Sequence, residues 1–232
     1  MQNITRTITH LLLLIFTCIL TACHNNNGQV NRLEKQIQKT VKLAYDFTIK
    51  VGQKEGFEKF ETYTLFILTR HGETLFLDSS LTEYQFDDEL FPIINNLGDN
   101  AFEILVEVND RPNKNYLKRI HIKNDHLIMT NNLPAFVSAA SNLDKDKNLE
   151  YAGFWDYAQQ WGDSNQLTAY NPIIYYEITP TGLRLDSSLT VDRNKFIYGK
   201  FNGFVFNENF EMPVSVTENF EKEITRITKM KK

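Results

Sequence analysis

Cysteine is scarce in this chain, and its scarcity excludes a disulfide framework. Only two cysteines occur among 232 residues, Cys18 and Cys23. Both lie near the N-terminus, so the rest of the chain must be stabilised by a packed core. With 17 phenylalanines and 10 tyrosines, the chain has enough large apolar side chains to build one domain.

Long apolar runs, excess positive charge and common catalytic strings are also missing. The apolar run at residues 11–20 is half the length of a membrane-spanning helix, which needs roughly 20 residues. The chain has 25 basic and 29 acidic side chains, and only Arg6 of these lies in residues 1–22, which leaves a net charge of −5 for the remainder. This charge argues against nucleic-acid binding. No Gly-x-Ser-x-Gly, His-Glu-x-x-His or P-loop string occurs.

The N-terminus has the order of a secretory signal. A polar segment with one basic residue precedes the apolar run, which ends in Leu20-Thr21-Ala22-Cys23. This ending resembles the lipobox of bacterial lipoproteins; an ordinary signal peptide and an N-terminal membrane helix are the alternatives. The resemblance implies cleavage before Cys23, acylation of that residue with chains such as palmitate, and a signal peptide at residues 1–22.

Lipid on Cys23 would fix the protein to a membrane. Each buried methylene contributes about 0.8 kcal/mol, so two or three acyl chains anchor a protein stably. His24, and not aspartate, follows the cysteine, which resembles the pattern of lipoproteins sorted to the outer membrane. We therefore expect an outer-membrane protein of the bacterial cell envelope, with a short tether at residues 23–29 and a single domain at residues 30–232.

Apolar spacing predicts a mainly β domain with a helix at each end. Steps of three and four residues predict an N-terminal amphipathic helix that packs on the domain or binds a partner, built on Val30, Leu33, Ile37, Val41 and Ala44. From Tyr45 onward the period falls towards two. Phe220, Ile224 and Ile227 predict a short C-terminal helix within residues 217–232.

An internal repeat organises the β region. The string Leu-Asp-Ser-Ser-Leu-Thr occurs at residues 77–82 and again at 185–190, and a divergent copy lies at 127–133. Each copy follows an apolar strand and a polar turn, so three antiparallel hairpins are predicted, with turns at Gly72-Glu73, Asn124-Asp125 and Thr181-Gly182. The resulting sheet is expected to be propeller-like or sandwich-like.

One polar loop has the residue types that bind calcium. Oxygen-bearing side chains alternate at Asn142, Asp144, Asp146, Asn148 and Glu150, and calcium takes six to eight oxygen ligands. The loop resembles those of FG-GAP and VCBS-type repeats, although Lys147 replaces their turn glycine. The resemblance implies side-chain ligands from 142, 144, 146 and 150 and a carbonyl from 148. The alternative is a loop whose polar groups only stabilise its turns.

Aromatic residues follow this loop. Trp155, Tyr157 and Trp161 belong either to the core or to a surface that binds a glycan or a partner protein. Because no catalytic pattern is present, the function expected is non-catalytic binding in the envelope.

An envelope hydrolase is the alternative function. Arg70-His71-Gly72-Glu73-Thr74 resembles the signature of histidine phosphatases, which implies phosphate binding by Arg70 and phosphorylation of His71. We expect instead that this string is a hairpin turn, because its two sister hairpins lack it. His121 and His126 should share one strand face, but two histidines make a poor zinc site.

Overall fold

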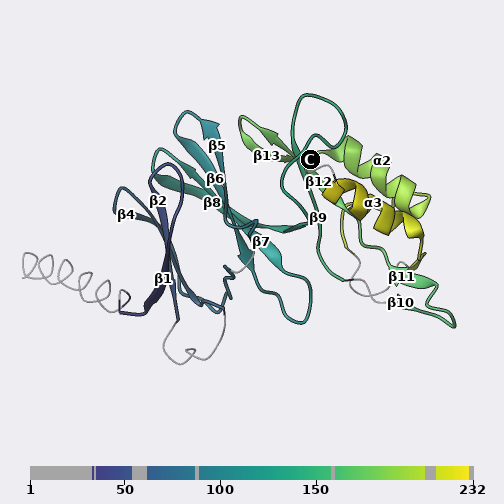
Figure 1. Cartoon of the computed structure of the whole chain (residues 1–232), viewed down its shortest axis with the longest axis horizontal. Helices are drawn as coiled ribbons and strands as arrows, with labels where there is room; N and C mark the ends of the chain where they lie inside the picture. Colours follow the sequence, from purple (N-terminus) through teal and green to yellow (C-terminus); the bar gives the residue numbers. More distant parts are fainter. Residues whose placement is uncertain are drawn as a thin grey trace, which may run out of the picture.

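The protein is mainly β, as its sequence predicts. The computed structural model describes residues 33, 35–53, 62–86, 89–157, 160–206 and 213–229. They form three antiparallel sheets and, near the C-terminus, helices α2 and α3 (Figure 1). No closed propeller is found in this part of the chain. The predicted signal peptide, Cys23 and the tether lie outside the described residues. Neither described helix is long and apolar enough to cross a bilayer.

The first sheet contains four strands in sequence order: β1 (Ile37–Lys42), β2 (Phe47–Gly52), β3 (Leu65–Arg70) and β4 (Glu73–Asp78). The largest sheet has the order β13-β12-β9-β8-β7-β6-β5. Its strands are β5 (Ile93–Gly98), β6 (Ala101–Val108), β7 (Tyr116–Lys123), β8 (His126–Phe136), β9 (Glu150–Phe154), β12 (Ile174–Thr179) and β13 (Gly182–Leu185). The third sheet joins β10 (Gln160–Trp161), β11 (Leu167–Ala169) and β14 (Pro213–Ser215).

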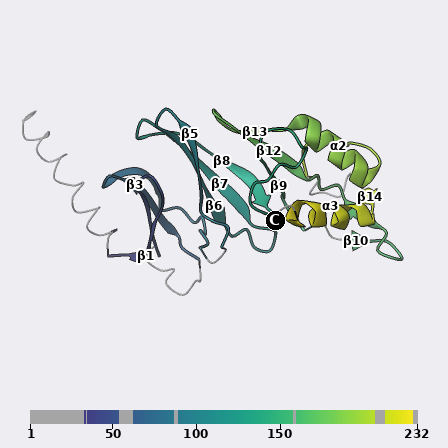
Figure 2. The ribbon, with the colours of Figure 1, turned by 45° about the horizontal axis from the view of Figure 1, so that its top comes forward.

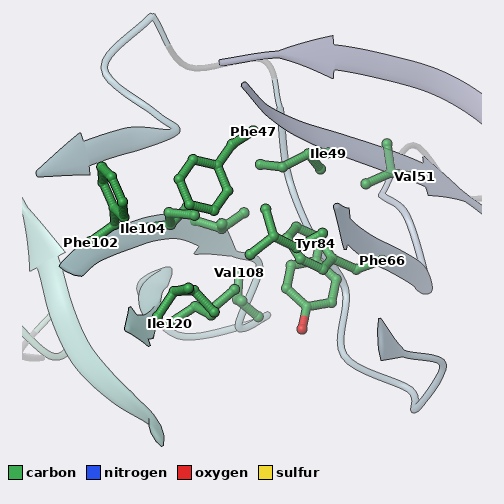
Figure 3. Packing of buried hydrophobic residues seen from close by; sticks show 12 residues of the cluster. Phe47, Ile49, Val51, Phe66, Tyr84, Phe102, Ile104, Val108 and Ile120 are labelled. Carbon is green, nitrogen blue, oxygen red and sulfur yellow. The ribbon is translucent and has the colours of Figure 1, made fainter. Parts of the chain in front are cut away.

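The first hydrophobic core lies between the four-stranded sheet and strands β6 and β7 (Figure 3). On β2, Phe47, Ile49 and Val51 are buried while Thr48 and Lys50 are partly exposed, which is the period of two expected for one buried strand face. Strand β6 is buried along its whole length. Its second face contributes Leu105 to another core, which includes residues of β8, β9 and β13.

Helices α2 (Ser187–Tyr198) and α3 (Glu218–Lys229) lie at the end of the molecule opposite β1 (Figures 1 and 2). They pack on β9 and β12 around Ala152, Tyr175 and Ile227. The Asp186 carboxylate accepts a hydrogen bond from the Leu189 N–H at the start of α2. Helix α3 confirms the C-terminal helix predicted within residues 217–232.

The predicted N-terminal amphipathic helix over residues 30–44 is wrong from Ile37 onward, whereas Leu33 is helical. Ile37–Lys42 is strand β1, which pairs with β2 and places Val41 against the first core. A spacing of four residues, as between Ile37 and Val41, fits one face of a helix and also one face of a strand. The neighbouring β2 provides hydrogen-bond partners and an apolar surface, and this tertiary pairing favours the strand.

All three predicted hairpins are present, but the two identical hexapeptides fold differently. Residues 77–82 leave β4 at Asp78, which accepts hydrogen bonds from the Ser80 N–H (2.8 Å) and the Tyr84 hydroxyl (2.6 Å). Residues 185–190 begin helix α2 after Asp186. An aspartate before Ser-Ser suits both a turn and a helix start, so the residues that follow decide the outcome.

Two of the three turns are shifted by one residue. The β3–β4 turn centres on His71 and Gly72 (φ 50° and 88°), and not on Gly72-Glu73. The β12–β13 turn lies at residues 180–181, because Thr179 pairs with Gly182. Asn124 and Asp125 form the β7–β8 turn as predicted, with φ 50° and 60°.

Candidate functional site

The acidic loop before β9 brings three predicted ligands together. A backbone pair between Ser141 and Glu150 (3.0 and 2.9 Å) closes the base of the loop. The carboxylates of Asp144, Asp146 and Glu150 each offer an oxygen within 4.8 Å of the other two. Asp144 and Asp146 are exposed and Glu150 is buried, so the cluster lies at the surface with one carboxylate beneath it.

Glu150 is the unusual member of this cluster. Its side chain is 1% exposed, and its Oε2 accepts a hydrogen bond from the Leu143 N–H (2.6 Å). Its Oε1 is also buried and has no hydrogen-bond partner among the described residues. Burial, together with the charges of Asp144 and Asp146, raises the pKa of Glu150 to about 7. A buried oxygen without a partner beside two other carboxylates is suited to a cation.

The two asparagines predicted as ligands also shape the loop. Asn142 Oδ1 accepts a hydrogen bond from the Lys145 N–H (2.5 Å), and its amide donates to the Asp146 carbonyl. The Asn148 amide donates hydrogen bonds to Asp146 Oδ2 (3.2 Å) and to the Glu177 carboxylate. The Asn148 side chain therefore acts as a hydrogen-bond donor in the loop. The left-handed residue of the loop is Lys145 (φ 72°), and φ at Lys147 is not positive. Replacement of the usual glycine by Lys147 therefore causes no backbone strain.

The loop faces the β12–β13 hairpin and the start of α2. A surface cavity of about 530 Å³ separates them and is lined by Asp144, Asp146, Glu177, Arg184, Leu185, Asp186, Ser187 and Ser188. Asp186 adds to the negative charge that raises the pKa of Glu150. The sequence around the loop did not indicate this contribution, because Asp186 lies in a distant part of the chain.

The aromatic residues predicted to bind are not gathered into one patch. Tyr157 is 68% exposed and lines a cavity of about 300 Å³ with residues of α3. Trp155 lines a separate cavity with residues 204–206. Trp161 is partly exposed on the short strand β10.

The phosphatase-like string serves the fold. The Arg70 guanidinium donates hydrogen bonds to the Tyr45 carbonyl (3.1 Å), Asn100 Oδ1 (2.6 Å) and Asp125 Oδ1 (2.8 Å). It also lies 4.5 Å from the centroid of the Phe102 ring. Arg70 therefore ties three turns together at one end of the facing sheets, and its donors are directed to protein acceptors.

His121 and His126 share one face of the β7–β8 hairpin, as predicted, because Lys123 pairs with His126 and His121 lies two residues before Lys123. His71 is exposed in its turn, with Nδ1 3.8 Å from Asp46 Oδ2. His121 is largely buried, 3.9 Å from Glu103 Oε1, whereas His126 is exposed. Among the described residues the only group of three or more His, Cys, Asp or Glu side chains that could hold a metal is the acidic loop.

The fold and the loop thus define a mainly β protein with one candidate cation centre. No protein-family model, characterised protein or solved structure matches the chain. Functional assignment therefore depends on the chemistry of the residues themselves.

Proposed function

We propose that this chain is a lipid-anchored, non-catalytic binding protein of the bacterial outer membrane that carries a calcium ion in its acidic loop. Cys23 would hold the lipid, and the folded domain would present a binding surface to an envelope protein or glycan. The ion would stabilise the junction between the acidic loop, β9 and the start of α2.

The observation that carries the calcium proposal is the unpartnered Oε1 of buried Glu150 beside Asp144 and Asp146. Such an oxygen costs free energy unless a partner compensates it. Calcium accepts oxygen ligands in a flexible arrangement of six to eight. Three carboxylates, the Asn148 carbonyl, Asn142 Oδ1 and water would supply that number. Zinc prefers nitrogen and sulfur ligands, and this cluster contains neither.

Calcium is expected to raise the melting temperature of the parent relative to chelator. At free calcium a hundredfold above Kd, stabilisation of about 2.7 kcal/mol corresponds to roughly 5–10 °C for a domain of this size. Asp144→Asn and Glu150→Gln should reduce this shift strongly, since each removes a ligand charge. Differential scanning calorimetry with calcium or EGTA measures it.

Asp192→Asn is the matched control, because Asp192 is an exposed aspartate on α2 outside the loop. It should respond to calcium like the parent. An unchanged melting temperature in the parent, or an equal shift in parent and Glu150→Gln, would remove the calcium proposal.

The calcium-free protein should lose stability as the pH rises from about 4.5 towards 8. The pKa of Glu150 is raised from 4.5 to about 7 by burial, so the folded state holds this proton more tightly than the unfolded state. The associated stability is present at low pH and is lost as the pH passes about 7. Glu150→Gln removes this component, and calcium should suppress it because the ion favours the charged form. Urea unfolding at pH 5 and pH 8 tests both statements; a parent and variant with the same pH dependence would contradict them.

The anchor is tested in intact cells. Full-length protein should incorporate labelled palmitate and fractionate with the outer membrane, and Cys23→Ala should lose both properties. Cys18→Ala, in the segment predicted to be removed, should retain them. Crosslinking in the same strains then shows whether binding to an envelope partner requires the lipid anchor. Palmitate incorporation by Cys23→Ala would exclude Cys23 as the lipid site.

A further inference from the structure

A second cavity, lined by other residues than the acidic loop, has the lining of a small-ligand site. It holds about 300 Å³ and lies between the end of β9, the third sheet, and helix α3. The third sheet and α3 are at the end of the molecule opposite β1 (Figures 1 and 2). Ligand pockets begin at about this volume, so the cavity can accept a small organic molecule.

Aromatic rings form one side of this cavity. The Phe154 ring is nearly perpendicular to the rings of Tyr157 (79°, centroids 6.2 Å apart) and Phe220 (76°, 5.4 Å). Tyr198 also lines the cavity, and its hydroxyl donates to the Asn171 carbonyl (2.8 Å). Rings at right angles present faces and edges in several directions, an arrangement that can surround a compact group.

The charged part of the lining is acidic. Asp156 and Glu221 contribute carboxylates, and no lysine or arginine is among the described lining residues. Asn171 is 2% exposed, and its Oδ1 is buried without a hydrogen-bond partner among the described residues. The lining therefore favours a positively charged ligand over an anion.

The same aromatic cluster already accommodates an ammonium group. Lys114 Nζ lies 3.9 Å from the centroid of the Phe154 ring, and Lys114 lines a neighbouring cavity rather than this one. Ammonium groups are attracted to aromatic faces, more strongly where water is excluded. The contact shows that Phe154 can present a ring face to a cation.

We propose that this cavity binds a small organic cation, a compound with a quaternary or primary ammonium group. The ammonium would contact the rings of Tyr157 and Phe220, with Asp156 and Glu221 balancing its charge. This site is independent of the calcium loop, so either proposal can fail without the other.

Choline and its neutral isostere 3,3-dimethylbutan-1-ol provide the test, because they differ mainly in charge. We expect the full-length protein in non-ionic detergent to bind choline at least about tenfold more tightly, as a cation–π contact and a carboxylate together would produce. Isothermal titration calorimetry measures both affinities. Glu221→Gln should weaken choline binding at least about threefold with little effect on the isostere.

The controls separate charge, shape and source. Asp163→Asn changes an exposed acid outside the cavity and should leave choline binding unchanged. The affinity for dihexanoylphosphatidylcholine, measured below its micelle concentration, is compared with the affinity for choline. Tighter binding of the lipid indicates that the ammonium ligand is a lipid headgroup, and tighter binding of choline indicates a free organic cation; both results support an ammonium site. Equal binding of choline and the isostere, binding of N-acetylglucosamine in place of choline, or no binding of any probe would overturn the proposal.

Discussion

Replacing Glu223 by alanine is expected to lower the free energy of unfolding by about 3–5 kcal/mol, the usual result of removing one partner from a buried ion pair. Glu223 is fully buried on α3. Its carboxylate accepts hydrogen bonds from the Tyr175 hydroxyl (2.6 Å), Arg193 Nε (2.9 Å) and Arg226 Nε (2.9 Å). One side chain thus connects β12, α2 and α3.

The charge of Glu223 is retained in spite of its burial. Burial alone would raise the pKa of this carboxyl, but hydrogen bonds from Arg193, Arg226 and Tyr175 outweigh it and lower the pKa. Removing the carboxylate takes away an acceptor that two arginines and a buried hydroxyl share, although Arg226 keeps its hydrogen bond to the Leu143 carbonyl (2.8 Å). Most of the expected loss comes from the hydrogen bonds to the missing carboxylate.

Urea unfolding of Glu223→Ala, Glu223→Gln and Glu218→Gln tests this expectation. Glu223→Gln keeps the shape and some hydrogen bonds, so it should lose less than Glu223→Ala. Glu218 is exposed on the same helix and pairs with Lys222 (2.9 Å), so its variant should leave the free energy of unfolding nearly unchanged. A loss below about 1 kcal/mol for Glu223→Ala would show that the cluster does not hold the helices.

Local chemistry explains which parts of the fold the sequence predicts. Hairpins depend on residues that tolerate positive φ, and Asn124-Asp125 marks such a turn directly. The C-terminal helix depends on apolar spacing within one segment, and its Ile224 and Ile227 do pack in the cluster around Ala152 and Tyr175. Both features are specified by neighbouring residues, so they can be predicted without knowing the tertiary structure.

Tertiary pairing explains what the sequence does not specify. Ile37 and Val41 fit either a helix or a strand, and only the position of β2 decides between them. The repeated Leu-Asp-Ser-Ser-Leu-Thr string becomes a turn after Asp78 and a helix after Asp186. In both copies the aspartate accepts a hydrogen bond from a backbone N–H two or three residues later. The residues that follow the hexapeptide determine whether the chain forms a turn or a helix.

The same distinction applies to the sites. Asp144, Asp146 and Glu150 lie within seven consecutive residues, so their convergence is predictable from spacing. The unpartnered oxygen of Glu150 results from its burial, which depends on the packing of the whole domain. The aromatic cavity joins Tyr157 to Phe220 and Glu221 from a segment more than 60 residues away. No local pattern relates these residues.

Gly182→Ala should destabilise the protein about as much as Glu223→Ala, by about 3–5 kcal/mol, because it displaces a second buried ion pair. Gly182 begins β13 with φ 112°. A Cβ at this position would overlap Glu103 Oε1 and would lie 2.8 Å from Arg119 Nη2. Glu103 is fully buried, pairs with Arg119, and accepts a hydrogen bond from the Leu183 N–H (2.8 Å). The carboxylate therefore cannot move away without losing two partners.

Gly203→Ala measures the backbone part of this loss, so the steric part can be obtained by subtraction. Gly203 has nearly the same φ, 117°, but a Cβ there would have no atom of the described residues within 4 Å, apart from its chain neighbours. Its variant should lose only the backbone component, about 1–2 kcal/mol. The difference between the two variants in urea unfolding then measures the cost of displacing the Glu103–Arg119 pair. Equal losses would mean that the β12–β13 hairpin can shift to accept the methyl group, and that this pair does not fix the hairpin against β6.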